Sequence, residues 1–193
     1  MNASLARCSD AELAALALAG QQSAYGELMR RHREAVFRVA RGHVGDATEA
    51  LDIVQETFIS AFTALARYDG TRPFRLWIAR IAVNKCRDWA RRRAVRRFFT
   101  FARPIEEANA VADNLPTPEE AVGSQAELAH IHAAIASLPG NLKDVLVLRT
   151  LEGVSQAEAA QILGISEKAV ETRLYRARNK LAEGLRDGAA DRV

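Results

Sequence analysis

Residues 155–181 read SQAEAAQILGISEKAVETRLYRARNKL, and this stretch decides the fold at the C-terminal end of the chain. Ser155 and Glu158 form the S-x-x-E pattern of a capping box, which opens a short helix. Gly164 supplies the left-handed residue that commonly ends a helix, and Ser166 is a good N-cap for the next one. The stretch therefore predicts two helices joined by a tight turn.

The second of these helices has an apolar side and a basic side. At about 100° per residue, the apolar side holds Val170, Leu174, Ala177 and Leu181. The other side holds Lys168, Thr172, Tyr175, Arg176 and Asn179, flanked by Arg173 and Arg178. A short helix, a glycine turn and a long basic helix make the helix-turn-helix pattern, whose second helix enters the major groove of DNA. Because these side chains suit base edges and phosphates, we favour DNA reading over a helical hairpin with a solvated basic face.

The whole chain has the composition of a globular protein with one or two domains. It has 193 residues, of which 49% are hydrophobic and 26% charged. No apolar run is long enough to cross a bilayer and no secretion signal opens the chain, so we expect a cytoplasmic protein without membrane insertion. Cys8, Cys86 and the four histidines show no metal-binding spacing, so we expect reduced thiols, no metal and no cofactor.

Charge lies in two blocks of opposite sign. Residues 71–103 hold eleven Arg or Lys residues against one acid, Asp88, whereas residues 104–130 hold six acids and neither Arg nor Lys. Blocks of one sign repel themselves, so the basic block favours a polyanionic partner and the acidic block an exposed connector. We rank a nucleic-acid partner above the alternative of two solvated faces that neutralise each other.

Helix signals also dominate the N-terminal part, where no stretch alternates apolar and polar residues as a strand would. Ser9 and Asp46 are each followed by Glu three residues later and are expected to cap the first and third helices. We expect Gly42 and Gly45 to break the second helix between them. The third helix is expected to bury Leu51 in its apolar stripe.

A fourth helix is predicted from the loop at residues 68–73 to about residue 97, because Pro73 suits a first turn. One side of it carries a stripe that would track phosphates, formed by Arg80, Asn84, Arg87 and Arg91. Tyr68 in the preceding loop is placed to stack on an unpaired base, although a single aromatic residue is more often part of a core.

Residues 100–124 separate these helices from the C-terminal ones. This segment is rich in Pro and acids and poor in large apolar residues, which is typical of a linker. We therefore predict an all-α fold of two small helical domains, at residues 1–99 and 125–193, joined by a flexible acidic linker at residues 100–124.

Two sets of motifs resemble one known family, the bacterial sigma-70-family factors of the extracytoplasmic-function (ECF) group. DIVQETF at residues 52–58, RPFRLWIARIAVN at residues 72–84 and RD at residues 87–88 resemble region 2 of these factors. SQAEAA at residues 155–160 and VETRLYRAR at residues 170–178 resemble region 4. The likeness covers roughly residues 9–97 and 125–183, and both sets stand in the family's order.

The resemblance implies an initiation factor with no catalytic site of its own, which binds core RNA polymerase, recognises promoter DNA and helps to melt it. It implies that Asp52, Gln55 and Glu56 meet the clamp coiled coil of the largest polymerase subunit, and that region 4 contacts the flap. The acidic linker resembles the connector that threads the nucleic-acid channel of the polymerase. Members of the group are commonly held inactive by an anti-sigma factor, which we expect here too.

The resemblance also distributes the DNA contacts over both regions. It implies that the minus-10 element is bound and melted at Tyr68, Arg80, Asn84, Arg87 and Arg91. It implies that the minus-35 element is read at Lys168, Thr172, Arg173, Tyr175 and Arg176. Glu171 departs from the Lys or Arg that many members carry, and an acid there is suited to accept from cytosine N4 or to repel wrong sites rather than to bind phosphate.

Two other functions would fit parts of the same pattern. A one-component regulator would sense a ligand with the N-terminal helices and bind an operator as a dimer, without polymerase. A recombinase with a DNA-binding tail would need a catalytic domain, for which the chain offers neither room nor a carboxylate cluster or activated serine.

Overall fold

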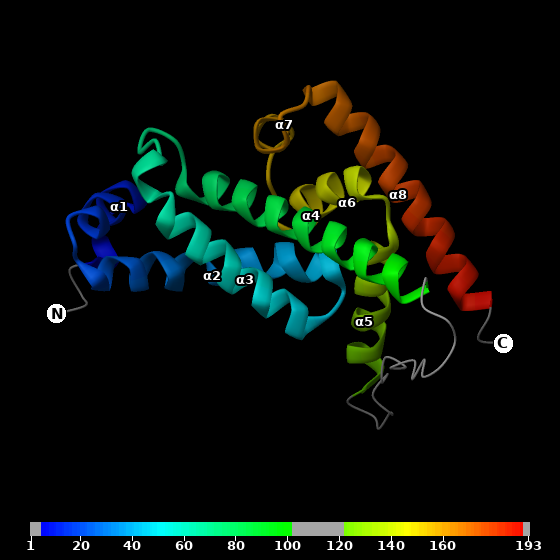
Figure 1. Ribbon diagram of the computed structural model, residues 1–193. Coiled ribbons are helices and arrows are strands. Elements are labelled where there is room, and N and C mark those ends of the chain that lie inside the picture. The colour runs from blue at the N-terminus through cyan, green and yellow to red at the C-terminus, as the bar shows by residue number, and fades with distance from the viewer. Residues whose placement is uncertain (1–4, 102–121, 191–193) are drawn as a thin grey trace.

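The computed structural model describes residues 5–101 and 122–190, and these form eight α-helices and no strand (Figure 1). The helices are α1 (Asp10–Leu18), α2 (Gln22–Val44), α3 (Ala47–Thr63), α4 (Phe74–Phe101), α5 (Val122–Ser137), α6 (Gly140–Leu146), α7 (Gln156–Leu163) and α8 (Glu167–Ala190). Short helical turns lie at η1 (Leu5–Arg7), η2 (Leu65–Arg67) and η3 (Val147–Leu151), the last of π type. The predicted all-α class is confirmed.

The predicted caps of the N-terminal helices are present. The Ser9 hydroxyl accepts a hydrogen bond from the Glu12 backbone N–H at 3.2 Å, and the Glu12 carboxylate accepts one from the Ser9 N–H at 2.6 Å. Asp46 likewise accepts from the Glu49 N–H at 2.9 Å. These bonds satisfy backbone donors that the first turn of a helix leaves free, so they fix where α1 and α3 begin.

The prediction that Gly42 breaks a helix is wrong. The helix α2 continues through Gly42 to Val44 and ends at Gly45, whose φ of +79° is the left-handed conformation of a C-cap. Gly42 is buried, and a Cβ there would lie 2.9 Å from side-chain carbons of both Val147 and Leu151. The glycine therefore allows a close approach of η3 to α2.

Helices α1–α4 form the N-terminal module, which the comparison below assigns to region 2. Its core consists of fully buried apolar side chains contributed by all four helices, among them Leu13, Leu28, Ile53, Phe58, Phe74 and Ile78. Leu51, which we expected in this core, is 45% exposed, because the stripe of α3 that packs inward runs through Ile53, Val54 and Phe58 instead. The helix α4 also runs beyond the predicted end, to Phe101.

Helices α5–α8 form the C-terminal module and contain the predicted helix-turn-helix. The capping box of Ser155 and Glu158 begins α7, and Gly164, at φ +67°, ends it. Ser166 accepts from the Ala169 N–H at 3.2 Å at the start of α8. Val170 and Ala177 are fully buried, as expected for the apolar side of the second helix.

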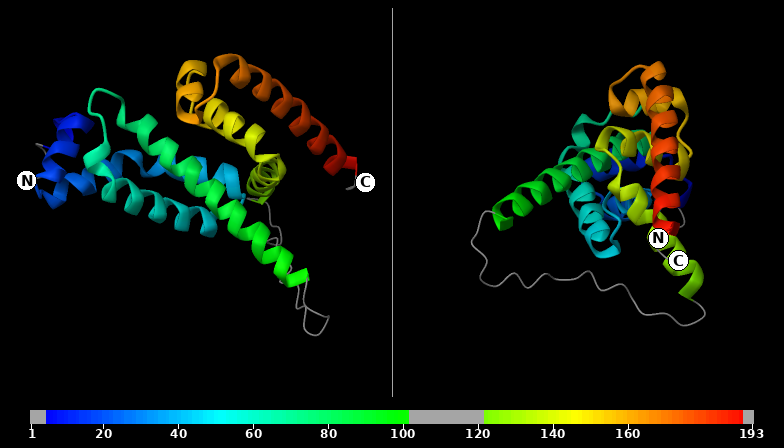
Figure 2. Two further views of the ribbon diagram at one scale, coloured as in Figure 1. Left: turned by 45° about the horizontal axis from the view of Figure 1, so that its top comes forward. Right: turned by 90° about the vertical axis from the view of Figure 1, so that its right-hand side faces the viewer.

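The two modules pack against each other, as Figures 1 and 2 show with the yellow-to-red helices lying along one side of green α4. On the N-terminal side, α2 contacts α5, α6 and η3, while α4 contacts α7. Most of the predicted linker, residues 102–121, lies outside the described residues. Among the described helices, none is long and apolar enough to cross a membrane.

Candidate functional site

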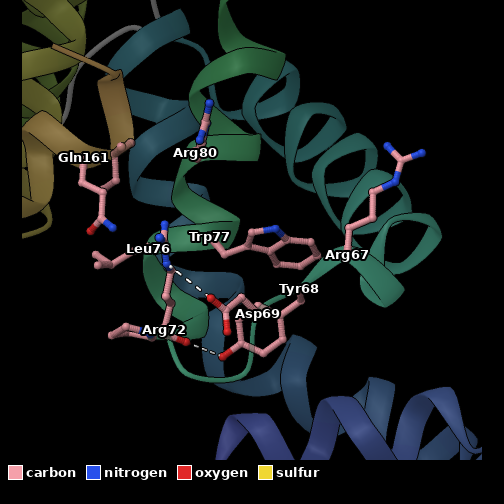
Figure 3. Close-up of a pocket in the computed structure, with 10 residues that line it drawn as sticks. Arg67, Tyr68, Asp69, Arg72, Leu76, Trp77, Arg80 and Gln161 are labelled. Atoms are coloured by element: carbon pink, nitrogen blue, oxygen red, sulfur yellow. Dashed lines mark hydrogen bonds and ion pairs between the residues drawn. The ribbon is translucent and has the colours of Figure 1, made fainter.

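A pocket of ≈ 270 Å³ opens beside the loop that precedes α4 (Figure 3). The end of η2, the loop and the first turns of α4 form most of its wall. The lining residues from these segments are Arg67, Tyr68, Asp69, Arg72, Pro73, Leu76, Trp77 and Arg80. Gln161 and Ile162 of α7 line it from the other module. Aromatic rings can stack on a planar group and guanidinium groups can pair with an anion, and both kinds of side chain surround this one hollow.

Tyr68 is half-buried in an aromatic cluster that shapes this loop. Its ring meets Phe74 edge-on at 5.1 Å between centroids and lies 5.3 Å from the ring of Trp77. The hydroxyl donates a hydrogen bond of 2.6 Å to the Arg72 carbonyl, which closes the loop (Figure 3). Burial raises the pKa of Tyr68, so the phenol stays a donor. Tyr68 therefore supports the loop and also lines the pocket.

The predicted basic stripe is present on α4, but its members differ in their surroundings. Arg80 lines the pocket, and Asn84, one turn further along α4, is exposed. Arg91 is exposed and pairs with Asp88 on the same helix. Arg87 instead donates from Nε and Nη2, at 2.9 and 2.6 Å, to Oδ2 of Asp144 in α6 of the other module.

Asp144 is the centre of a buried charged cluster between the modules. Its side chain is 3% exposed, and its second oxygen, Oδ1, lies 2.9 Å from Nε2 of His43 in α2. Burial opposes ionisation of Asp144, but the hydrogen bonds from His43 and Arg87 outweigh it and lower the pKa of the carboxyl. Burial likewise opposes a charged His43, but Cys86 and Asp144 raise the pKa of the imidazole to about 10.

The outer face of α3 carries the three residues expected to bind polymerase. Asp52 and Gln55 are exposed, whereas Glu56 is partly covered and pairs with Arg92 of α4 at 3.2 Å. Leu51 and Ile59 lie beside them and are 45% and 59% exposed. The face thus combines acidic, amide and exposed apolar groups.

The polar side of α8 faces away from the helix-turn-helix core. Tyr175 is 68% exposed, and Arg176 and Thr172 are also exposed, while Arg173 is partly buried. Glu171, the acid that departs from the family pattern, forms an ion pair of 2.9 Å with Lys168 on the same helix. The arrangement presents donors at the start of the helix that a helix-turn-helix inserts into the major groove.

Sequence reasoning missed part of this surface. Trp77 and Arg72 line the pocket and lie in the RPFRLW motif at residues 72–77, but neither was among the predicted DNA-binding residues. The contribution of Gln161 from α7 had no local signal. Within the described residues, no group of His, Cys, Asp and Glu could hold a metal ion.

Two family models match the chain, one for each module. Residues 28–96 match Sigma-70 region 2, and residues 128–181 match Sigma-70, region 4. Among curated proteins, the chain is 43% identical over 177 residues to RNA polymerase sigma factor CnrH of Cupriavidus metallidurans, covering 90% of this chain and 93% of that one. It is 32% identical over 174 residues to ECF RNA polymerase sigma factor SigM of Mycobacterium tuberculosis, covering 90% and 83%.

The solved structures that resemble this chain are also sigma factors. The structure of CnrH in complex with the cytosolic domain of CnrY is 36% identical, has a TM-score of 0.69, and covers 93% of this chain and 99% of that chain. The sigma factor RpoE of Bartonella quintana, in complex with the anti-sigma factor NepR, shares the fold at 20% identity, a TM-score of 0.64, and 84% and 96% coverage. Members of the family regulate transcription rather than catalyse a reaction. The chain therefore belongs to the sigma-70 family, in its extracytoplasmic-function group of RNA polymerase sigma factors.

Proposed function

We propose that this sigma factor binds core RNA polymerase in the cytoplasm through α3, opens the minus-10 element with the α4 loop and reads the minus-35 element with α8. The observation that carries the proposal is the division of exposed groups between the modules. A pocket of aromatic and basic residues lies on region 2, and an exposed polar helix face lies on region 4. Such a division suits a protein that binds an opened DNA strand with region 2 and the major groove of closed duplex with region 4.

The outer face of α3 supports the polymerase contact. Asp52, Gln55 and Ile59 follow one another at helical spacing of three and four, so they share one stripe of the helix. Acidic and amide groups around exposed apolar side chains complement a basic, amphipathic helical partner such as a coiled coil. Glu56 would have to exchange its Arg92 partner for the polymerase.

The pocket beside Tyr68 supports the melting step. Holding a base outside the stack costs a few kcal/mol, which stacking on aromatic rings and backbone contacts can offset. Tyr68, Trp77 and Arg80 offer such contacts around one hollow. Melting would follow from binding a single strand more tightly than the duplex.

Control by an anti-sigma factor is part of the proposal. The relative CnrH was solved in complex with the cytosolic domain of CnrY, a protein partner. A groove lined by residues of both modules, among them Asp52, Trp89 and Lys143, offers a protein segment a surface that includes one predicted polymerase contact. A partner seated there would compete with the polymerase.

Transcription in vitro tests the function. Purified core polymerase is mixed with the chain and a library of genomic DNA fragments from the source organism, and the 5′ ends of the transcripts are sequenced. We expect starts that share two sequence elements at fixed spacing and that vanish when the chain is omitted. Transcripts without a shared element, or the same starts from core enzyme alone, would contradict the proposal. Binding of an operator by the chain alone as a dimer would favour the one-component regulator.

A further inference from the structure

Glu171 is an exposed acid on the polar side of α8. Its side chain is 57% exposed, and Oε2 accepts a hydrogen bond of 2.9 Å from Nζ of Lys168, which is itself 80% exposed. Exposed ion pairs are weak, because water and salt screen them. A carboxylate also has room for about four hydrogen bonds. A donor at a DNA surface can therefore replace Lys168 or bind beside it.

A hollow of ≈ 410 Å³ lies next to Glu171, on the side of α8 where α7 packs against it (Figure 1). It is lined by Gln156 of α7 and by Glu171, Thr172, Leu174, Tyr175 and Arg178 of α8. The Thr172 hydroxyl donates to the Lys168 carbonyl at 2.9 Å, so its proton is used within the helix. A donor that enters the hollow therefore meets a carboxylate as its charged acceptor.

Glu171 and Arg176 lie on opposite borders of the exposed face of α8. At roughly 100° per residue they are separated by about 140° around the helix, and Tyr175, 68% exposed, lies between them. Along the helix axis they are about 7.5 Å apart, which is roughly twice the spacing of base pairs. One border thus offers an acceptor and the other a guanidinium donor, for two different base pairs.

The major groove offers a carboxylate few donors. Cytosine presents its N4 amino group, adenine presents its N6 amino group next to the N7 acceptor, and guanine and thymine present acceptors. An ionised carboxylate accepts hydrogen bonds and donates none, so N7 of adenine and O6 of guanine repel it. A carboxylate at a base edge therefore favours cytosine over adenine, and adenine over guanine and thymine.

We propose that Glu171 selects cytosine at one position of the minus-35 element, roughly two base pairs from the position that Arg176 reads. The proposal rests on the proposed function, because it requires α8 to lie in the major groove. On binding, cytosine N4 donates to the Glu171 carboxylate, and Lys168 becomes free to pair with a phosphate. Guanine or thymine at this position leaves the carboxylate near the DNA phosphates without a donor, which lowers affinity.

Exchange of the side chain tests this assignment, because each replacement predicts a different base. Glu171→Gln introduces an amide, which pairs with N6 and N7 of adenine, and Glu171→Lys introduces a donor for O6 and N7 of guanine. Wild type, Glu171→Gln and Glu171→Lys are therefore expected to prefer cytosine, adenine and guanine at the same position. The control Glu183→Gln removes another exposed acid about 18 Å further along α8 and should keep the preference for cytosine.

The assay uses each full-length variant bound to core RNA polymerase and a promoter found in the library experiment. Every position of the minus-35 element is changed to each of the four bases, and the transcript yield is measured for each template. We expect wild type to transcribe the cytosine template about tenfold or more better than the guanine and thymine templates. Glu171→Ala should lose this ratio, whereas Arg176→Ala should change the preference at a different position.

The outcomes separate this proposal from the proposed function. A wild type without a preference for cytosine, or Glu171 variants that keep the wild-type preference at every position, would overturn the proposal and leave the function intact. So would a Glu171→Ala variant that raises the yield from all templates by one factor, because Glu171 would then only repel phosphates. Wild-type transcripts whose start sites share no minus-35 element would instead refute the proposed function.

Discussion

Arg87 of α4 and Asp144 of α6, 57 residues apart in sequence, share two hydrogen bonds of 2.9 and 2.6 Å across the boundary between the two modules. The carboxylate is almost fully buried, and its other oxygen meets His43. A buried carboxylate is tolerated only when such partners compensate its lost hydration. The packing of the two modules therefore depends on the charges of Arg87, Asp144 and His43.

Packing of the modules should weaken as pH rises. His43 interacts with Asp144 of α6 and Cys86 of α4, and Lys143 of α6 donates to its carbonyl; the pKa of His43 in the packed state is about 10. Separation of the two modules would return the pKa of His43 toward about 6.5. The contribution of protonated His43 to the packing of the modules is thus fully present below about pH 6.5. It is lost as pH rises toward 10. We expect the radius of gyration to increase from pH 6.5 to 9 in the wild type and to change less in His43→Gln. A wild-type radius that stays constant over this range would remove His43 from the interface energetics.

Tyr68 should act through its ring more than through its hydroxyl. Tyr68→Ala removes the stacking surface, which is worth about 1–3 kcal/mol for each base, and should reduce open complexes by at least about tenfold. Tyr68→Phe loses only the bond to the Arg72 carbonyl and should retain most activity. Permanganate reactivity of unpaired thymines measures the melting, and core binding serves as the control. Normal melting by Tyr68→Ala would contradict the proposed base contact.

Asn84 should matter for melting and not for assembly. It is exposed one turn beyond Arg80 on the polar stripe of α4, and its amide can donate to and accept from a base edge. We expect Asn84→Ala to lower the yield of open complex several-fold with unchanged affinity for core polymerase. Gln55→Ala on α3 should show the reverse pattern. If the two variants behaved alike, the assignment of separate surfaces would be wrong.

Arg176 should discriminate between bases of the minus-35 element. It is exposed on the polar side of α8, and loss of a bidentate base contact costs about 1–3 kcal/mol. Arg176→Ala should therefore relax selectivity at one position of the element in a saturation library. Lys168→Ala should weaken all sequences similarly and reduce the salt dependence, as expected for a phosphate contact. Undiminished discrimination by Arg176→Ala would refute its role.

Local features of this fold could be predicted from the sequence because their causes lie within a few residues. The capping boxes at Ser9 and Ser155, the left-handed Gly164 and the buried side of α8 are of this kind. The same holds for the exposed face of α8, since helical periodicity fixes which residues share a side.

The packing of the modules could not be predicted, because its partners are distant in sequence. Asp144 and His43 are 101 residues apart, and no local pattern pairs them. Gly42 was expected to break a helix because a glycine has low helix propensity, and only the approach of Val147 explains its place inside α2. Leu51 was assigned to the core because periodicity alone does not distinguish a buried stripe from an exposed apolar edge of the same helix.

Charge reversal on α3 should separate polymerase binding from DNA binding. Asp52 is exposed and is not part of either DNA surface, so Asp52→Lys should leave the fold intact. Repulsion of a basic partner helix should weaken association with core polymerase by about tenfold or more. Asp69→Lys, on the loop of region 2, serves as a control for the added charge. Equal affinities of Asp52→Lys and wild type would remove α3 from the interface.

The most direct measurement of the central claim is the affinity of the purified wild-type chain for core RNA polymerase. The chain is labelled with a fluorophore, and its anisotropy is followed as core enzyme is added. The account predicts a saturable one-to-one complex that unlabelled wild-type chain displaces and that Asp52→Lys displaces poorly. No change in anisotropy up to micromolar core enzyme, with a chain that is helical and monodisperse, would contradict it.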